Sequence, residues 1–238
     1  KSGALATTDG YAKELDRIIS DPRARKTLQT FFSQWLRVAE IPKLTTSNGD
    51  AVFKTFAGPD LPNEPAPGAD PLRDTVMQEI FDMVDYYVWD KGGSLDDLMS
   101  SNLVFPKSPE LAKIYGVAPW QGGDPPEALE SRPGFLTRAA FLVSGEANTR
   151  PIIRGVFVRR GLLCDDLPDP PNGNVPPPPP LSDKMATRQT VEALTEGAGN
   201  CPVCHKGSIN PLGFALEGFD GLGRARTEQR LFQKDGTE

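Results

Sequence analysis

Residues 201–205 of this 238-residue chain read Cys201-Pro202-Val203-Cys204-His205. Two cysteines three residues apart on a helical turn face the same side, so their sulfurs can add to the two vinyl groups of one porphyrin. The histidine that follows them can then reach the iron as its proximal ligand. The motif therefore predicts one covalently attached haem c in the C-terminal half of the chain, held by Cys201, Cys204 and His205.

Two other chemistries use similar cysteine spacings. A structural zinc ion takes four protein ligands, and the chain's three cysteines and single histidine would suffice if Cys164 were the fourth. A redox dithiol of the thioredoxin type is the second alternative. Such dithiols follow a strand in a βαβ unit, whereas Gly-rich and Pro-rich loops precede the motif here. Outside the zinc alternative, Cys164 is expected to be a buried small hydrophobic residue or a free thiol.

His205 is the only histidine of the chain. The ring nitrogen of an iron-ligating histidine that does not bind the metal usually donates a hydrogen bond, which fixes the tautomer of the ring. We expect the acceptor to be a backbone carbonyl in the loop 209–212.

The residues after the motif form an extended pattern. They read Ile209-Asn210-Pro211-Leu212-Gly213-Phe214-Ala215-Leu216-Glu217-Gly218-Phe219-Asp220-Gly221-Leu222-Gly223-Arg224-Ala225-Arg226. With the motif, this run resembles the haem-bearing domain of the planctomycete-type cytochrome domains of unknown function in large bacterial proteins. Other parts of this domain resemble residues 132–137, 151–155 and 163–164, and the helical domain that usually precedes it resembles residues 21–25, 31–36 and 111–116.

The resemblance implies an exported, haem-bearing, mainly helical protein, usually with a further C-terminal domain. It says little about substrates. Many members carry a histidine about six residues before the first cysteine of the motif, and this chain has Thr195 there. A role for that histidine therefore cannot be carried over.

The residues after the motif are predicted to contact the haem. The apolar ones expected beside the porphyrin are Pro211, Leu212, Phe214, Leu216, Phe219 and Leu222, and packing of a small core is a compatible alternative. The charged residues expected to form ion pairs that hold the loop are Glu217, Asp220, Arg224 and Arg226. The two arginines could instead bind haem propionates, since a guanidinium fork matches a carboxylate.

The sixth iron ligand cannot be a second histidine of this chain. Methionine is the remaining soft donor. Met77, Met83 and Met99 belong to expected helices and are interpreted as core residues. Met185 lies between a proline-rich run and Cys201, and is the methionine that we predict as ligand. Another methionine, or an open, water-bound or partner-supplied position, is the alternative.

Helical signals dominate the chain. Asp-Pro pairs at 21–22 and 70–71 predict helix starts, each followed by apolar residues at helical spacing. Ser94 and Ser108-Pro109 predict two shorter helices. Further helices are expected at 136–143, 151–163 and 187–196, with Arg154, Arg159 and Arg160 on a solvated face of the second. The predicted fold is mainly α, with two small helical domains or layers.

Long connections separate these helices, as 24 prolines and 23 glycines indicate. Loops are expected at 41–69 and 117–134 because both are rich in Pro and Gly and lack a period. Residues 168–180 should form a polyproline strap that lies along the protein's own surface or docks in a partner's groove. The predicted domains are 1–130, helical and of unknown function, and 131–238, haem-binding.

Composition restricts the partners. Hydrophobic residues make up 38% of the chain and charged residues 24%, which is typical of a globular protein. No apolar run approaches the roughly 20 residues that a membrane-spanning helix needs. The net charge of −6 disfavours nucleic acid and suits a basic protein surface. The chain begins at Lys1 and ends on a turn-like stretch, so we expect a piece of a longer polypeptide. Three cysteines exclude a pure disulfide framework.

Electron transfer is the function that these features favour. We expect a single-haem cytochrome that works with protein redox partners, as a subunit or domain of a larger assembly, in the periplasm or elsewhere outside the cytoplasm. Association with a membrane complex is compatible with this interpretation. The alternatives are a haem enzyme of the peroxidase or oxidase type with an open iron site, and a structural module stapled by haem. The enzyme is the weaker alternative because the chain has no distal histidine.

Overall fold

The computed structural model describes residues 3–46, 49–63, 66–123, 126–168, 180–197, 199, 201–233 and 237. Residues 169–179 of the predicted polyproline strap lie outside them. The chain forms two compact units, Lys1–Ala39 and Glu40–Glu238. The predicted domains 1–130 and 131–238 are a different division, and they stay a prediction.

The first unit consists of short helical elements joined end to end: η1 (Ala4–Ala6), α1 (Thr8–Ile19), α2 (Pro22–Trp35) and the start of η2 (Val38–Glu40). As predicted, Asp21 begins α2, where its carboxylate accepts a hydrogen bond from the Arg23 amide at 2.9 Å. The rings of Phe31, Phe32 and Trp35 pack together with centroids 5.5–5.7 Å apart.

The second unit is mainly α, which confirms the predicted fold class. Its longer α-helices are α4 (Pro71–Asp85) and α9 (Thr187–Thr195). The shorter ones are α3 (Ala51–Ala57), α5 (Leu95–Ser100), α6 (Pro109–Tyr115), α7 (Ala139–Leu142), α8 (Pro151–Phe157), α10 (Cys201–Cys204) and α11 (Asn210–Phe214). The 3-10 turns are η4 (Gly58–Asp60) and η6 (Phe135–Thr137), and the π turns are η5 (Tyr86–Asp90), η7 (Val158–Leu162) and η9 (His205–Ile209).

One small sheet occurs in the described part of the chain. Its strands β1 (Leu103–Val104) and β2 (Glu127–Ala128) are antiparallel, with Leu103 opposite Ala128 and Val104 opposite Glu127.

The predicted helix starts of this unit are confirmed. Asp70 accepts from the Arg73 amide at 3.0 Å at the start of α4. Ser94 and Asp97 form a reciprocal capping box on α5. Ser108 caps α6, which ends at Gly116 in the left-handed conformation, φ 73°.

Two local expectations are wrong. The segment 41–69 contains α3, which Asp50 caps and which buries Phe53 and Phe56. Arg154 does not lie on a solvated face, because its side chain is 5% exposed. The described residues of 117–134 form the predicted loop, apart from the two-residue strand β2.

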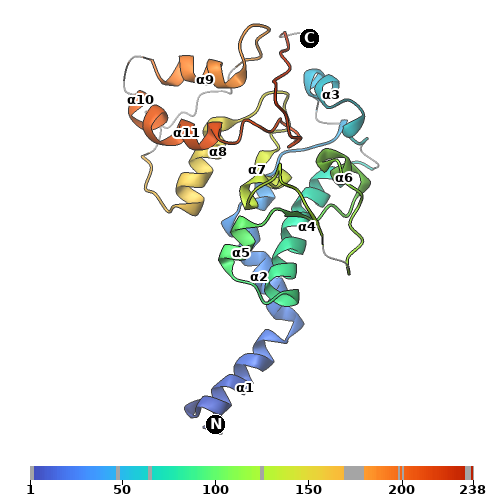
Figure 1. Ribbon diagram of the computed structural model, residues 1–238, viewed down its shortest axis with the longest axis vertical. Helices are drawn as coiled ribbons and strands as arrows, with labels where there is room; N and C mark the ends of the chain where they lie inside the picture. Colours follow the sequence, from blue (N-terminus) through green and yellow to red (C-terminus); the bar gives the residue numbers. More distant parts are fainter. Residues whose placement is uncertain are drawn as a thin grey trace. The chain divides into compact units, whose positions relative to one another are not determined.

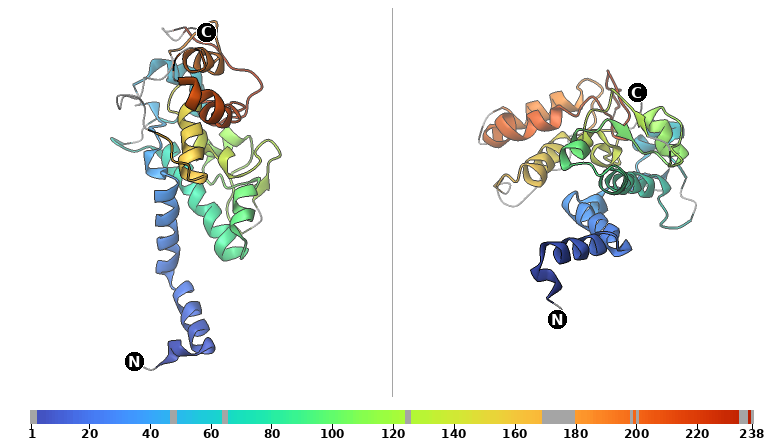
Figure 2. Two further views of the ribbon diagram at one scale, coloured as in Figure 1. Left: turned by 90° about the vertical axis from the view of Figure 1, so that its left-hand side faces the viewer. Right: turned by 60° about the horizontal axis from the view of Figure 1, so that its bottom comes forward.

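Two groups of contacting helices in the second unit position the motif and its surroundings (Figures 1 and 2). In one, α4 contacts α6 and α7. In the other, α8 lies beside α11 and also contacts α9 and η9. The second group holds the Cys-X-X-Cys-His motif.

Candidate haem site

The motif begins with the single turn α10, which contains no buried residue. Cys201 is exposed and Cys204 half-buried, and both are free thiols. Val203 between them is 79% exposed. Cys201 is therefore open to solvent and Cys204 partly open, as a covalent attachment at this turn would require.

His205 opens the π turn η9, whose backbone hydrogen bond runs from the Asn210 amide to the His205 carbonyl. A π turn pairs residue i with i+5, so it brings the side chain of residue 210 back to that of residue 205. The His205 Nδ1 lies 3.2 Å from the Asn210 Oδ1. The expected acceptor was a backbone carbonyl of the loop 209–212. The structure places the side-chain amide of Asn210 at this nitrogen instead, so the prediction is right about the segment and wrong about the group.

Asn210 is itself held from α9. It is fully buried, and its Nδ2 donates to the Thr195 Oγ1 at 2.9 Å and to the Glu196 Oε1 at 2.8 Å. No role for Asn210 or Glu196 was predicted from the sequence, although the Asn-Pro pair that begins five residues after His205 was a usable signal.

Two glycines let α8 and α11 approach each other closely. A Cβ at Gly213 would lie 1.9 Å from the Pro151 carbonyl oxygen, and one at Gly155 would lie 2.1 Å from the Ile209 carbonyl oxygen. Atoms at such distances overlap, so this crossing requires glycine at both positions. The crossing fixes the end of η9 and the start of α11, which is the segment that follows His205 in the chain.

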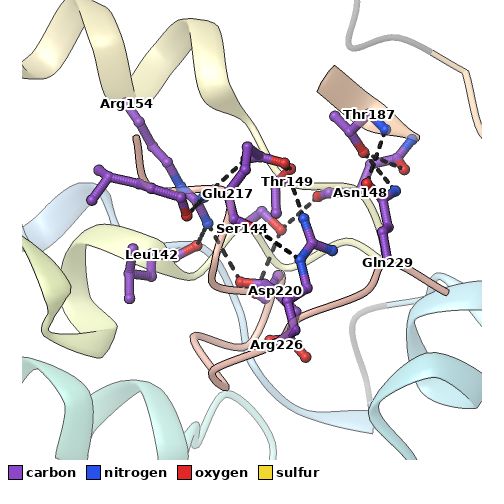
Figure 3. Close-up of polar contacts among 12 residues, drawn as sticks. Leu142, Ser144, Asn148, Thr149, Arg154, Thr187, Glu217, Asp220, Arg226 and Gln229 are labelled. Atoms are coloured by element: carbon purple, nitrogen blue, oxygen red, sulfur yellow. Dashed lines mark hydrogen bonds and ion pairs between the residues drawn. The ribbon is translucent and has the colours of Figure 1, made fainter. Parts of the chain in front are cut away.

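Arg154, from α8, holds the loop that follows α11 (Figure 3). Its guanidinium donates to the Leu216 carbonyl at 3.1 Å and to the Glu217 Oε1 at 3.2 Å, and also reaches the carbonyls of Leu142 and Asp220. Burial lowers the pKa of Arg154 to about 10, and the charge of Glu217 opposes that shift. The side chain remains a cation at neutral pH.

The predicted ion pairs within this loop are confirmed. Glu217 accepts from Arg226 at 3.0 Å and from Thr149 at 2.7 Å, as Figure 3 also shows. Arg224 pairs with Asp220 at 2.7 Å and with Asp60 at 2.9 Å. Both arginines therefore have carboxylate partners in the protein, and their contact with haem propionates stays a prediction.

The start of α9 is attached to the same loop system. Thr187 donates to the Asn148 Oδ1 at 3.1 Å, and its hydroxyl accepts from the Gln229 Nε2 at 2.9 Å (Figure 3). The Gln229 Oε1 accepts from the Thr187 amide at 2.9 Å. These hydrogen bonds attach the start of α9, the helix whose other end holds Asn210, to Asn148 and Gln229.

The apolar residues after the motif divide into two sets. Leu216 and Phe219 are buried against Leu142, and Leu222 is buried as well, so these residues pack the core. Leu212 and Phe214 are half-buried and Pro211 is exposed. The second set is the one that borders the surface, and haem contact by any of these residues stays a prediction.

A shallow hollow of about 470 Å³ lies between α9 and α11 beside the motif, and its lining residues are Arg188, Glu192, Glu196, Lys206, Pro211, Phe214 and Ala215. The Arg188 guanidinium stands 4.9 Å from the centre of the Phe214 ring. The hollow thus combines an aromatic wall with two cations at its edge.

The methionines differ in exposure. Met83 is fully buried, and Met77 and Met99 are half-buried. Met185, the predicted iron ligand, is 38% exposed and precedes α9, with its amide donating to the Ser182 Oγ at 3.1 Å.

Three observations bear on the alternatives to haem. Cys164 is an exposed free thiol with φ 56°. Of the two states expected for it, the free thiol is confirmed and the buried hydrophobic residue is not. Among the described residues, no group of three or more His, Cys, Asp or Glu side chains is arranged to hold a metal ion. The motif follows helix α9 and not a strand, unlike a thioredoxin-type dithiol.

An accessible Cys-X-X-Cys-His turn on a mainly α scaffold defines the class of cytochrome-type domains. Residues 132–229 match the family model PSCyt3, described as a protein of unknown function (DUF1588), and residues 1–117 match PSD4, described as a protein of unknown function (DUF1592). The chain therefore belongs to the planctomycete-type cytochrome domain families of unknown function, as the sequence resemblance indicated. No curated protein and no solved structure matches the chain. None of the helices in the described part is both long and apolar enough to cross a membrane.

Proposed function

We propose that this chain carries one haem c, attached through Cys201 and Cys204 with His205 as axial ligand, and that it transfers electrons within a larger redox assembly. The observation that carries the proposal is the juxtaposition at residues 201–210. Two free thiols lie one turn apart on α10, and the adjacent imidazole has its Nδ1 engaged by Asn210, which leaves Nε2 for a metal.

The donor set fits the group. Two thiols and one imidazole in this order are the attachment residues of haem c. A bound haem c would supply one-electron redox chemistry at its iron. The protein's part is to hold His205 still, and the crossing of α8 with α11 and the bond to Asn210 do this. A rigid ligand environment keeps the structural change between oxidation states small.

The attachment is tested by expressing the chain with a cytochrome c maturation system and measuring its intact mass and absorption spectrum. We expect a mass increase of one haem that survives acid-acetone extraction. Replacing Cys201 and Cys204 together by serine should abolish it, and the matched control Cys164→Ser should leave it unchanged. A bare polypeptide mass from the competent host would contradict the proposal.

The sixth ligand in this proposal is Met185. It is the most exposed of the four methionines and therefore the least occupied in the core. Met185→Leu should open the iron to carbon monoxide and lower the midpoint potential, since a methionine ligand raises it. Met99→Leu is the matched control from a half-buried position. An unchanged spectrum and potential in Met185→Leu would exclude this ligand.

The proposed location is the periplasm or another extracytoplasmic compartment, because haem is attached to this motif on the outer side of the bacterial membrane. The net charge of −6 suits redox partners with a basic surface. Cell fractionation should recover the haem-bearing protein outside the cytoplasm, and recovery of all of it from the cytosol would refute the location.

A further inference from the structure

The amide of Asn210 can be oriented from its hydrogen-bond partners alone. Thr195 donates its only hydroxyl hydrogen to the Val191 carbonyl at 2.7 Å, so toward Asn210 it can only accept. An ionised Glu196 carboxylate, 2.8 Å away, also only accepts. Both partners therefore require the NH₂ group of Asn210 on their side.

The opposite end of the amide then faces His205. The Asn210 Oδ1 only accepts hydrogen bonds, so the His205 Nδ1 at 3.2 Å must be the donor. A flipped amide would place Oδ1 against a carboxylate oxygen and a hydroxyl with no free hydrogen, so this fully buried oxygen would have no hydrogen-bond donor and would face two other acceptors.

We propose that Asn210 is the positioning residue that fixes the tautomer of His205, with the proton on Nδ1 and the lone pair on Nε2. Thr195 and Glu196 hold the amide in the orientation that does this. The binding of iron by Nε2 rests on the proposed function, whereas the tautomer of the ring does not.

The role of Thr195 follows from this arrangement. The Thr195 hydroxyl donates to the Val191 carbonyl of its own helix, and its oxygen accepts from the Asn210 amide. Thr190 makes the same bond to its own helix, with the Ala186 carbonyl at 3.2 Å. It provides a matched control on α9.

The first test is the nitrogen NMR spectrum of His205 in the full chain produced without haem, recorded under mildly alkaline conditions. A free histidine side chain prefers the Nε2–H tautomer, so a predominant Nδ1–H signal would support the proposal. Thr195→Val and Asn210→Leu should shift the population toward Nε2–H, while Thr190→Val and the rescue variant Thr195→Ser should match the parent. A parent ring in the Nε2–H form would overturn the proposal.

The second readout is the midpoint potential of the haem-loaded protein. An acceptor on Nδ1–H raises the basicity of the ligand and favours the oxidised iron. Thr195→Val and Asn210→Leu should therefore raise the potential, and Thr190→Val should not. Equal potentials in Thr195→Val and the parent would overturn the positioning role. If no variant and no parent chain acquires haem, the proposed function fails, and the tautomer measurement still decides this inference.

Discussion

The attachment segment, residues 201–205, and the platform segment, residues 209–223, are adjacent in sequence and opposite in environment. The attachment segment has no buried residue, and Val203 at its centre is 79% exposed. Most of the platform is buried, including Ile209, Asn210, Gly213, Leu216, Phe219 and the run 220–223. The difference indicates that the reactive groups border solvent and that the buried platform segment fixes their positions.

The far end of the platform is held by a second buried cation. The guanidinium of Arg132 donates to the Gly223 carbonyl at 2.5 Å and lies between the rings of Tyr115 and Phe219, 4.1 and 5.0 Å from their centres. The Tyr115 hydroxyl donates to Glu79 and accepts from the Ala139 amide. The platform is thus attached to α8 at one end and to α4 and α6 at the other.

The largest effect is expected at the crossing of α8 and α11. In Gly213→Ala the new Cβ would lie 1.9 Å from the Pro151 carbonyl oxygen, so the native crossing cannot form without backbone movement. We expect loss of the cooperative thermal transition. Gly207→Ala is the matched control, because its Cβ would meet nothing within 4 Å. Circular dichroism melts of both variants measure the contrast, and equal melting temperatures would show that the platform is not rigid here.

Sequence patterns predicted what depends on neighbours in the chain. The caps at Asp21, Asp70, Ser94 and Ser108 follow from the polar side chain just before each helix, and all four are confirmed. The mainly α class follows from the apolar period. Local chemistry also predicted the ion pairs of Arg224 and Arg226, whose partners Asp220 and Glu217 lie within ten residues.

Contacts between distant segments could not be predicted in the same way. Gly213 needs to be glycine because of Pro151, and nothing in the sequence links these two positions. The burial of Arg154 depends on carbonyls from residues 142, 216 and 220, which only the fold brings together. The helix α3 was missed for a different reason, since its seven residues are too few to show a period inside a Pro- and Gly-rich segment.

The second-largest effect on stability is expected from the substitution of Arg154. Arg154→Met removes one partner of a buried ion pair and leaves three backbone carbonyls without this donor, so we expect a loss of about 3–5 kcal/mol in the free energy of unfolding. Arg188→Met is the control, because Arg188 and Glu192 form an exposed pair worth at most about 1 kcal/mol. Denaturant titrations give both values. A loss below about 1 kcal/mol at Arg154 would mean that the loop does not depend on this cation.

The third effect is a pH dependence from Glu79. Burial raises the pKa of this carboxyl above its ordinary 4.5, against the opposing charges of Arg138 and Arg132. The folded state then binds the proton more tightly than the unfolded state. The stabilisation is complete below about pH 4.5 and is lost as the pH rises through the raised value, with a slope of at most about 1.4 kcal/mol per pH unit. Glu79→Gln should remove this slope from the unfolding free energy, and an identical slope in the variant would contradict the assignment.

The smallest effect on stability is expected in the attachment segment itself. Cys201 is exposed and its turn buries nothing, so Cys201→Ala should change the free energy of unfolding of the haem-free chain by no more than about 0.5 kcal/mol. The same substitution removes one of two covalent attachment points, so in the proposed function the haem-loaded variant keeps a single thioether and a shifted absorption spectrum. Denaturation of the haem-free protein and spectra of the matured protein measure the two effects separately. A large loss of stability without haem would show that the cysteine supports the fold, and the contrast between an open attachment segment and a rigid platform would then not hold.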